Sequence, residues 1–172
     1  MKQKILVFIP AYNCQNQITR VIKQFDETIQ KYLTTVILVD NKSLDDTLKV
    51  SIDASTKQFK YCRFQILENN NNFGLGGSHK VAFRYAIKNN YDYLIVLHGD
   101  DQASIKDIIP LLKDGIHNNY DCLLGSRFMK RSKLIGYSKF RTFGNILYNQ
   151  IFSIILGKKV YDLGSGLNLY SL

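Results

Sequence analysis

The sequence predicts an α/β fold with a mostly parallel sheet and helices on both of its faces. Short apolar runs alternate along the chain with stretches of helical periodicity, and the runs are apolar at nearly every position. A strand of that kind is buried on both sides, so helices must cover both faces of its sheet. The 172 residues, 45% hydrophobic and 22% charged, suit one globular domain, which we expect to span residues 1–172.

Five apolar runs are expected to form the strands, because each is short and is followed by a turn-forming or polar residue. Pro10 ends the first run and Asp40 ends the second. The runs are residues 4–9, 35–39, 62–67, 93–97 and 121–124. The last segment, residues 162–170, is expected to form a loop and a further strand.

Helices are expected between these strands, where apolar residues recur at helical spacing. The first should begin near residues 13–17 and continue to about residue 32. Ser43 starts a capping-box-like sequence, SLDDT, that should lead a helix through Ile52. A loop over residues 68–77 should precede a helix over about 78–89, Ser104 should cap a helix that reaches Leu112, and a long helix should occupy residues 140–156.

Polar residues that follow the strands are the candidate site residues, because ligands of such sheets bind beyond the carboxyl ends of the strands. These residues are Asn13, Asp40, Asp100 and Arg127. In LHGDDQ, His98, Asp100 and Gln102 alternate and would point the same way in an extended segment. Carboxylates in such a loop can hold a divalent cation against a diphosphate. Capping of the helix near Ser104 would explain the acids without a ligand.

Two further segments could contribute to a nucleotide site. The Asp40 carboxylate could accept hydrogen bonds from a nucleobase or ribose, or it could form a turn with its own backbone. Gly76 and Gly77 could allow a tight turn past a ligand with Lys80 near the helix start, or they could form a plain helix-entry loop. The glycines do not follow the order of a P-loop or of GxGxxG, which disfavours a dinucleotide site.

The positive charge is concentrated in one part of the chain. The net charge is +9, and residues 122–161 contain eight Lys and Arg residues and no acidic residue. Such a segment should attract phosphate, an acidic lipid surface or nucleic acid, although a solvated basic face would have the same composition. Three cysteines without CxxC spacing argue against a disulfide framework or a zinc site and favour a cytoplasmic protein. No apolar run reaches the roughly 18 residues of a membrane span.

Seven motifs together resemble one protein family. IPAYN, VDNKSLDDT, NNFGLGGS, LHGDDQ, LLGSRF, FRTFGN and DLGSGLNLY occur in the order found in family 2 glycosyltransferases, over almost the whole chain. They are most similar to the branch that contains dolichol-phosphate mannose synthase and bacterial polyprenyl-phosphate glycosyltransferases. The resemblance implies the GT-A fold, a UDP- or GDP-sugar donor, Mg²⁺ or Mn²⁺, and transfer with inversion at the anomeric carbon.

The resemblance also assigns residues on the donor side. Pro10, Tyr12 and Asn13 match the end of the strand at the donor pocket, and Asp40 matches the acid that contacts the base. Asp100 matches the metal-binding acid of the DxD-like motif. Gln102 occupies a further ligand position, and His98 stands where the first Asp of that motif often is. Asp101 next to Asp100 would allow a shifted DD pair.

On the acceptor side the resemblance assigns phosphate-binding arginines and one short segment. Arg127 and Arg141 match arginines that hold phosphate in the lipid-phosphate branch, and Asp162, Ser165 and Gly166 match the segment beneath the acceptor. An alcohol acceptor needs a general base, whereas a phosphate is already anionic. Because no acidic pair follows Asp121, a polyprenyl phosphate acceptor is favoured over a saccharide hydroxyl.

Many relatives continue beyond the position of Leu172, so the chain is expected to be a catalytic-domain fragment, or residues 145–156 with Lys158 and Lys159 attach it to the inner face of the cytoplasmic membrane. Core packing of that helix is the simpler expectation.

Two other functions remain as alternatives. A non-catalytic binder of RNA or acidic surfaces would use the basic segment, but no RNP-like aromatic pattern supports it, and nucleic acid is not an expected partner. A nucleotidyltransferase would need a glycine- and lysine-rich loop after the first strand, which IPAYNCQNQ does not supply.

Overall fold

The computed structural model describes residues 3–129, 132 and 138–172. The chain forms two compact units, which are described separately below. Unit 1 comprises Met1–Leu123 together with Leu167–Leu172, and unit 2 comprises Leu124–Gly166.

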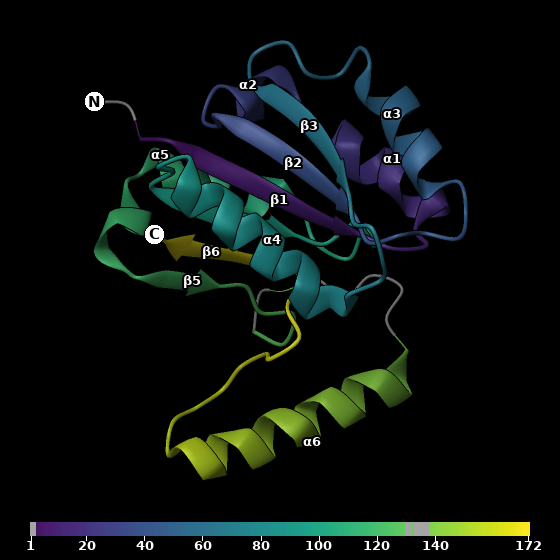
Figure 1. The fold of residues 1–172 in the computed structure, drawn as a ribbon. Helices are drawn as coiled ribbons and strands as arrows, with labels where there is room; N and C mark the ends of the chain where they lie inside the picture. Colours follow the sequence, from purple (N-terminus) through teal and green to yellow (C-terminus); the bar gives the residue numbers. More distant parts are fainter. Residues whose placement is uncertain (1–2, 130–131, 133–137) are drawn as a thin grey trace. The chain divides into compact units, whose positions relative to one another are not determined.

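Unit 1 is built on a six-stranded sheet with the order β3-β2-β1-β4-β6-β5 (Figure 1). β1 pairs in parallel with β2 and β4, β2 pairs in parallel with β3, and β6 runs antiparallel to β4. The strands are β1 (Ile5–Ala11), β2 (Thr35–Asp40), β3 (Arg63–Glu68), β4 (Tyr93–Leu97), β5 (Cys122–Leu124) and β6 (Leu167–Ser171). The predicted α/β fold with a mostly parallel sheet is confirmed.

The core lies on both faces of the central strands. Every residue of β1, β2 and β4 is buried. Successive side chains of a strand point to opposite faces, so Ile5, Val7 and Ile9 join one apolar cluster while Leu6 and Phe8 join the other. The first cluster includes apolar residues of helix α1 (Gln15–Lys23), and the second includes Ala82 and Ala86 of helix α4 (Gly74–Lys88). Helices therefore cover both faces, as the apolar strands predict.

The helix expected to reach residue 32 is instead two helices, α1 and α2 (Glu27–Gln30). Phe25 is fully buried between them, and the Asp26 carboxylate accepts a hydrogen bond from the Ile29 backbone N–H to start α2. The apolar spacing continues through the break, so periodicity alone does not reveal it. The interpretation of Ser104 was right in part, because Ser104 caps only the short helix η1 (Ile105–Asp107), which α5 (Ile109–Lys113) and η2 (Ile116–Asn119) follow.

Two expected helix starts are also corrected. Helix α3 is Thr47–Ser55, and the Asp45 carboxylate, rather than Ser43, accepts the hydrogen bond from the Thr47 backbone N–H. The Ser43 hydroxyl instead bonds the Asp40 carboxylate, so it belongs to the loop that follows β2. Helix α4 begins at Gly74, four residues before the expected start, because the glycines form its first turn.

Unit 2 contains one long helix, α6 (Lys139–Leu156), where the sequence predicts it. Ser138 caps its start, and Gly157 ends it with a left-handed φ of 61°. The buried Asn149 side chain donates to the Tyr161 carbonyl at 2.9 Å and accepts from the Leu163 backbone N–H at 3.2 Å. These bonds hold the loop after α6 against the helix. Among the described residues, no helix is both long enough and apolar enough to cross a bilayer.

Candidate functional site

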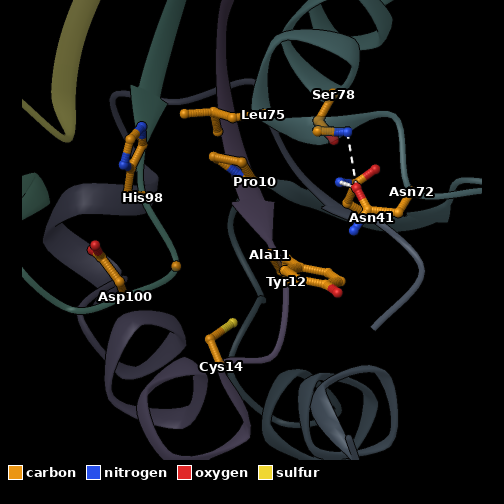
Figure 2. A pocket seen from close by; sticks show the side chains of 12 residues that line it. Pro10, Ala11, Tyr12, Cys14, Asn41, Asn72, Leu75, Ser78, His98 and Asp100 are labelled. Carbon is orange, nitrogen blue, oxygen red and sulfur yellow. Dashed lines mark hydrogen bonds between the residues drawn. The ribbon is translucent and has the colours of Figure 1, made fainter. Parts of the chain in front are cut away.

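A pocket of about 350 Å³ lies in unit 1, at the edge of the sheet where β1 and β4 end (Figure 2). It is the edge at which the sequence predicts ligand binding, since the parallel strands end there. The pocket is lined by Pro10, Ala11, Tyr12, Cys14, Asn41, Asn72, Gly74, Leu75, Ser78, His98, Gly99 and Asp100.

Gly99 allows the ends of β1 and β4 to approach each other closely. Its backbone N–H donates to the Pro10 carbonyl at 3.1 Å, and a Cβ atom at this position would lie 2.9 Å from the same oxygen. Any side chain at position 99 would therefore push the two strand ends apart. The glycine in LHGDDQ fixes the positions of His98 and Asp100 relative to Pro10.

The structure brings His98 and Asp100 to the same pocket but leaves Gln102 out of its lining. Asp100 is exposed, and its Oδ1 accepts a hydrogen bond from the Gln102 backbone N–H at 3.2 Å. Gln102 thus orients the Asp100 carboxylate through its backbone. Across the described ranges, no group of three His, Cys, Asp or Glu side chains is arranged to hold a metal ion.

Asp101 points toward α1 and has a different environment from Asp100. It adopts a left-handed φ of 61°, and its carboxylate pairs with Arg20 Nε at 2.6 Å. Gln24, the residue directly after α1, donates to Asp101 and to the Ala103 carbonyl, and it accepts from the Ile105 backbone N–H. Asp101 therefore anchors the loop after β4, with its charge balanced by Arg20.

Pro10 and Tyr12 line the pocket, whereas Asn13 and Asp40 support the loop behind it. Asn13 has a left-handed φ of 48°, and its Oδ1 accepts from the Leu44 backbone N–H at 2.8 Å. Asp40 is 1% exposed and accepts from both the backbone N–H and the hydroxyl of Ser43. Both residues fix the β2–α3 loop and do not line the pocket, whereas the adjacent residues Tyr12 and Asn41 do.

Sequence reasoning missed the amides on the β2 side of the pocket. Asn41 follows Asp40 at the end of β2, and Asn72 lies in the loop before α4. The rule that selected Asp40, a polar residue at the carboxyl end of a strand, applies equally to Asn41. Gly76 and Lys80 do not line the pocket, and a Cβ atom at Gly76 would meet nothing within 4 Å.

Cys14 also lines the pocket, at the start of α1. Burial raises the pKa of its thiol, outweighing the hydrogen bonds from Thr47 and the Tyr12 backbone, which act in the opposite direction. The side chain therefore adds an uncharged, weakly polar surface to the floor of the pocket.

In unit 2 the structure pairs two of the predicted residues, Arg127 and Asp162. Arg127 Nε and Nη2 contact the two oxygens of Asp162 at 2.8 and 2.9 Å, and its backbone N–H donates at 2.9 Å. Gly164 donates a further backbone bond. Burial alone would raise the pKa of Asp162, but the hydrogen bonds from Arg127 and Gly164 outweigh it, so the pKa lies below its usual range.

The other predicted residues of unit 2 differ in their exposure. Arg141 is exposed in the first turn of α6, Ser165 is partly buried, and Gly166 is buried. The assignment of these residues, and of Arg127 and Asp162, to an acceptor site stays a prediction.

The sequence matches a family model described as glycosyl transferase family 2 over residues 6–171. It is 25% identical over 138 residues to a dolichol-phosphate mannosyltransferase of Pyrococcus furiosus, covering 80% of this chain and 37% of that protein. It is 24% identical over 170 residues to an undecaprenyl-phosphate mannosyltransferase of Micrococcus luteus, covering 97% of this chain and 66% of that protein. The chain thus spans less than two thirds of the length of either relative.

Solved structures share the fold at low identity. A glucosyl-3-phosphoglycerate synthase of Mycobacterium tuberculosis, in complex with Mn²⁺, UDP and glucosyl-3-phosphoglycerate, matches with a TM-score of 0.68 at 16% identity, over 98% of this chain and 57% of that one. A mannosyltransferase of Pyrobaculum calidifontis, in complex with GDP-Man and Mn²⁺, matches with a TM-score of 0.64 at 14% identity, over 99% of this chain and 45% of that one. The fold is therefore GT-A, and the chain belongs to glycosyl transferase family 2.

Proposed function

We propose that this chain transfers a sugar from a nucleotide-diphospho-sugar to a polyprenyl phosphate, with inversion at the anomeric carbon. The observation that carries the proposal is the pocket at the ends of β1 and β4, which combines an exposed carboxylate, Asp100, with an aromatic ring, Tyr12, and neutral amides (Figure 2). These are the groups that a diphosphate with its counter-ion and a nucleobase require. Two similar proteins are named dolichol-phosphate mannosyltransferase and undecaprenyl-phosphate mannosyltransferase, which supports a polyprenyl phosphate as the acceptor.

The donor set at His98 and Asp100 fits a divalent cation that is shared with the donor. Mg²⁺ is commonly bound through one or two carboxylates together with substrate phosphates, and an imidazole suits Mn²⁺. When bound, the ion would neutralise the charge that develops on the leaving diphosphate. Asp100 would hold it, with His98 as a second ligand.

The surrounding residues keep Asp100 in place for this role. The Gln102 backbone N–H holds one carboxylate oxygen, and the Asp101–Arg20 pair fixes the next residue of the loop to α1. A fixed carboxylate does not have to reorganise when the donor binds, which is the advantage of a preorganised site.

The state of Asp162 favours a phosphate acceptor over a hydroxyl. A general base must accept a proton, yet both oxygens of Asp162 already accept hydrogen bonds and its pKa is lowered. A phosphate acceptor needs no base. We propose that Arg141, exposed on α6, contributes positive charge for it, since the charge of Arg127 is already balanced by Asp162.

We propose that helix α6 contacts a membrane surface. Its exposed residues include Phe140, Phe143 and Ile154, and Lys158 and Lys159 follow its end. Apolar side chains beside cations are typical of helices that lie in an anionic interface. A lipid phosphate would be presented at that surface.

The proposal is tested by incubating the protein with UDP- and GDP-sugars, Mn²⁺ or Mg²⁺, and undecaprenyl phosphate in detergent. We expect release of one nucleoside diphosphate and formation of a glycosylated lipid phosphate, detected by mass spectrometry. Parallel reactions with oligosaccharide acceptors test the alternative. Transfer to an oligosaccharide and none to the lipid would contradict the proposed acceptor, and absence of any donor turnover would contradict the proposed reaction.

A further inference from the structure

Helix α4, which lies on one face of the sheet (Figure 1), carries a row of positive charge on its outer side. Its buried residues Ala82 and Ala86 pack against the sheet, and Lys80 and Arg84 lie on the opposite side of the helix. Lys88 continues the row, because residues four apart are neighbours on a helix surface. All three cations are exposed, and they follow one another over about 12 Å of the helix axis. We call Lys80, Arg84 and Lys88 the α4 ridge.

The α4 ridge has no acidic partner, unlike other exposed lysines of unit 1. Helix α4 contains no Asp or Glu, and across the described residues none of the three ridge cations forms an ion pair. By contrast, Lys31 pairs with Glu27 at 2.9 Å, and Lys42 pairs with Glu68 at 2.8 Å. The charge of the ridge is therefore available to an external anion.

The row of cations is unfavourable for the helix by itself. Like charges four residues apart repel each other, so the neighbours Lys80 and Arg84, and the neighbours Arg84 and Lys88, each destabilise α4. The helix dipole favours Lys88 in the last turn, but Lys80 and Arg84 lie further from that end. Helix stability therefore accounts for Lys88 alone, whereas a bound anionic surface would offset the repulsion along the whole ridge.

The side chains around the α4 ridge favour a lipid surface over a nucleic acid. Ile87 is 63% exposed and lies beside Arg84, which precedes it by three residues on the helix. Exposed apolar side chains among cations are typical of helices that bind an anionic bilayer. Single-stranded nucleic acids instead stack their bases on exposed aromatic rings. The aromatic residues of this helix, Phe83 and Tyr85, pack against the apolar cluster beneath α4.

We propose that the α4 ridge docks unit 1 onto an anionic lipid bilayer. Lys80, Arg84 and Lys88 contact headgroup phosphates, and Ile87 enters the boundary between the headgroups and the acyl chains. This docking adds a contact from unit 1 to the membrane contact proposed for α6. It requires neither a bound donor nor the transfer reaction.

Docking through α4 would bring the pocket of unit 1 close to the bilayer. Gly74 and Leu75, the first residues of the helix, line the pocket, and Lys80 follows Leu75 by about 8 Å along the helix axis. The proposed acceptor is a lipid whose phosphate lies at the membrane surface. The ridge would therefore hold the donor site near that phosphate, a consequence that rests on the proposed function although the docking itself does not.

The test is co-sedimentation of the full chain with vesicles of phosphatidylcholine, either pure or with about 30% phosphatidylglycerol. The parent should bind the anionic vesicles much more tightly than the neutral ones. The variant Lys80→Gln/Arg84→Gln/Lys88→Gln should bind the anionic vesicles about 100-fold more weakly, because each cation near such a surface contributes about fivefold in affinity. Glutamine is a good helix former and the like-charge repulsion is removed, so this variant should melt no lower than the parent. If it does melt lower, Arg84→Gln alone replaces it, with an expected loss of about fivefold.

Lys49→Gln/Lys57→Gln/Lys60→Gln is the matched control, because it removes the same charge from exposed lysines in and just after α3. Helix α3 packs its Val50 and Ala54 on the apolar cluster of the other face of the sheet. The control should keep the affinity of the parent for anionic vesicles.

Three results would overturn the proposal. They are a parent that does not bind anionic vesicles, equal binding by the parent and the ridge variant, and an equal loss in the ridge and control variants. Polyuridylate RNA is titrated in parallel, and a ridge variant that loses RNA binding but keeps vesicle binding would assign the ridge to nucleic acid instead. Vesicle binding is measured without donor or acceptor, so failure of the proposed transfer reaction would leave this result unchanged.

Discussion

Unit 1 and unit 2 are each stabilised by a different kind of interaction. In unit 1 three neighbouring strands are buried along their whole length, and apolar clusters pack on both faces of the sheet. In the described part of unit 2 no hydrophobic residue is buried, and its buried side chains are Asn149 and Asp162. Unit 2 therefore depends on directed polar contacts, such as the bonds from Asn149 to the loop that follows α6.

Because of this difference, unit 1 should be rigid during the proposed reaction and unit 2 should open more easily. Apolar packing fixes the strand ends that form the nucleotide pocket, and such cores open only with global unfolding. A segment held by a few hydrogen bonds opens at much lower free energy, which would suit binding of the proposed lipid acceptor. The variants below test this contrast.

The largest expected effect is on activity alone. Asp100→Ala removes the exposed carboxylate of the pocket but no buried contact, so transfer should fall by about 100-fold to 1,000-fold while the melting temperature stays within about 1 °C. Initial rates with the active donor and thermal unfolding provide the two readouts. Asp107→Ala, another exposed acid close by in the chain, is the control and should be fully active. An equal loss in both variants would remove Asp100 from the proposed mechanism.

The contrast between the units also explains what the sequence could predict. The buried strands β1, β2 and β4 were predicted to within two residues at each end, because a strand buried on both faces is apolar at every position. β1 continues through Pro10 to Ala11, two residues past its expected end. Helix ends were less accurate, since the break at Phe25 preserves the apolar spacing that defines a helix. Only tertiary contacts decide such a break.

The candidate site was predicted in part for related reasons. Asp100 and Tyr12 stand out because strand ends and chemical type mark them, and the structure places both at the pocket. Asn72 sits in a run of four asparagines that is typical of any solvent-exposed loop, and only its bonds to Asn41 and Gly74 distinguish it. The Arg127–Asp162 pair spans 35 residues, a separation that no local pattern can connect.

The second prediction concerns the stability of unit 2. The Asp162 side chain is 1% exposed and that of Arg127 is 17% exposed, so Asp162→Ala leaves an arginine without its carboxylate partner in a nearly buried position. We expect a loss of about 3 kcal/mol in the local free energy of opening. Hydrogen exchange of α6 amides should accelerate accordingly, while amides of β1 and β4 keep their protection. Equal acceleration in both units would mean that they unfold together and would contradict the contrast.

The same pair predicts a dependence on pH. The pKa of Asp162 in the folded state lies below its unfolded value of about 3.9, so the pair stabilises the folded state above about pH 4. This stabilisation should be lost as the pH falls through the lower, folded pKa. Protection factors of α6 amides should therefore decrease in acid in the parent and change much less in Asp162→Asn. A parent profile that matches the variant would show that the ion pair contributes nothing.

The fourth prediction compares two glycines of unit 1. Gly99→Ala places a Cβ atom 2.9 Å from the Pro10 carbonyl, and unfolding should become easier by about 1 to 3 kcal/mol, with weaker nucleotide binding. Gly76→Ala lies in the first turns of α4 with no atom within 4 Å of the new Cβ, so it should be neutral or stabilise by up to about 1 kcal/mol. Urea unfolding and nucleotide titration measure both. Weakened binding in Gly76→Ala alone would restore Gly76 to the site.

The smallest effect is expected at the second ion pair, Arg20–Asp101, which matches the chemistry of Arg127–Asp162 in an exposed setting. The Arg20 side chain is 61% exposed and that of Asp101 is 23% exposed, so solvent and salt screen their attraction. Arg20→Ala should cost about 0.2 to 1 kcal/mol in urea unfolding at low salt, and the difference should vanish in about 1 M NaCl. Gln24 holds the same loop through three hydrogen bonds that salt does not screen, so Gln24→Ala should cost more and keep its cost in salt. If Arg20→Ala instead cost as much as Asp162→Ala, burial would not be what separates the two pairs, and the polar contacts of unit 1 would matter as much as its apolar core.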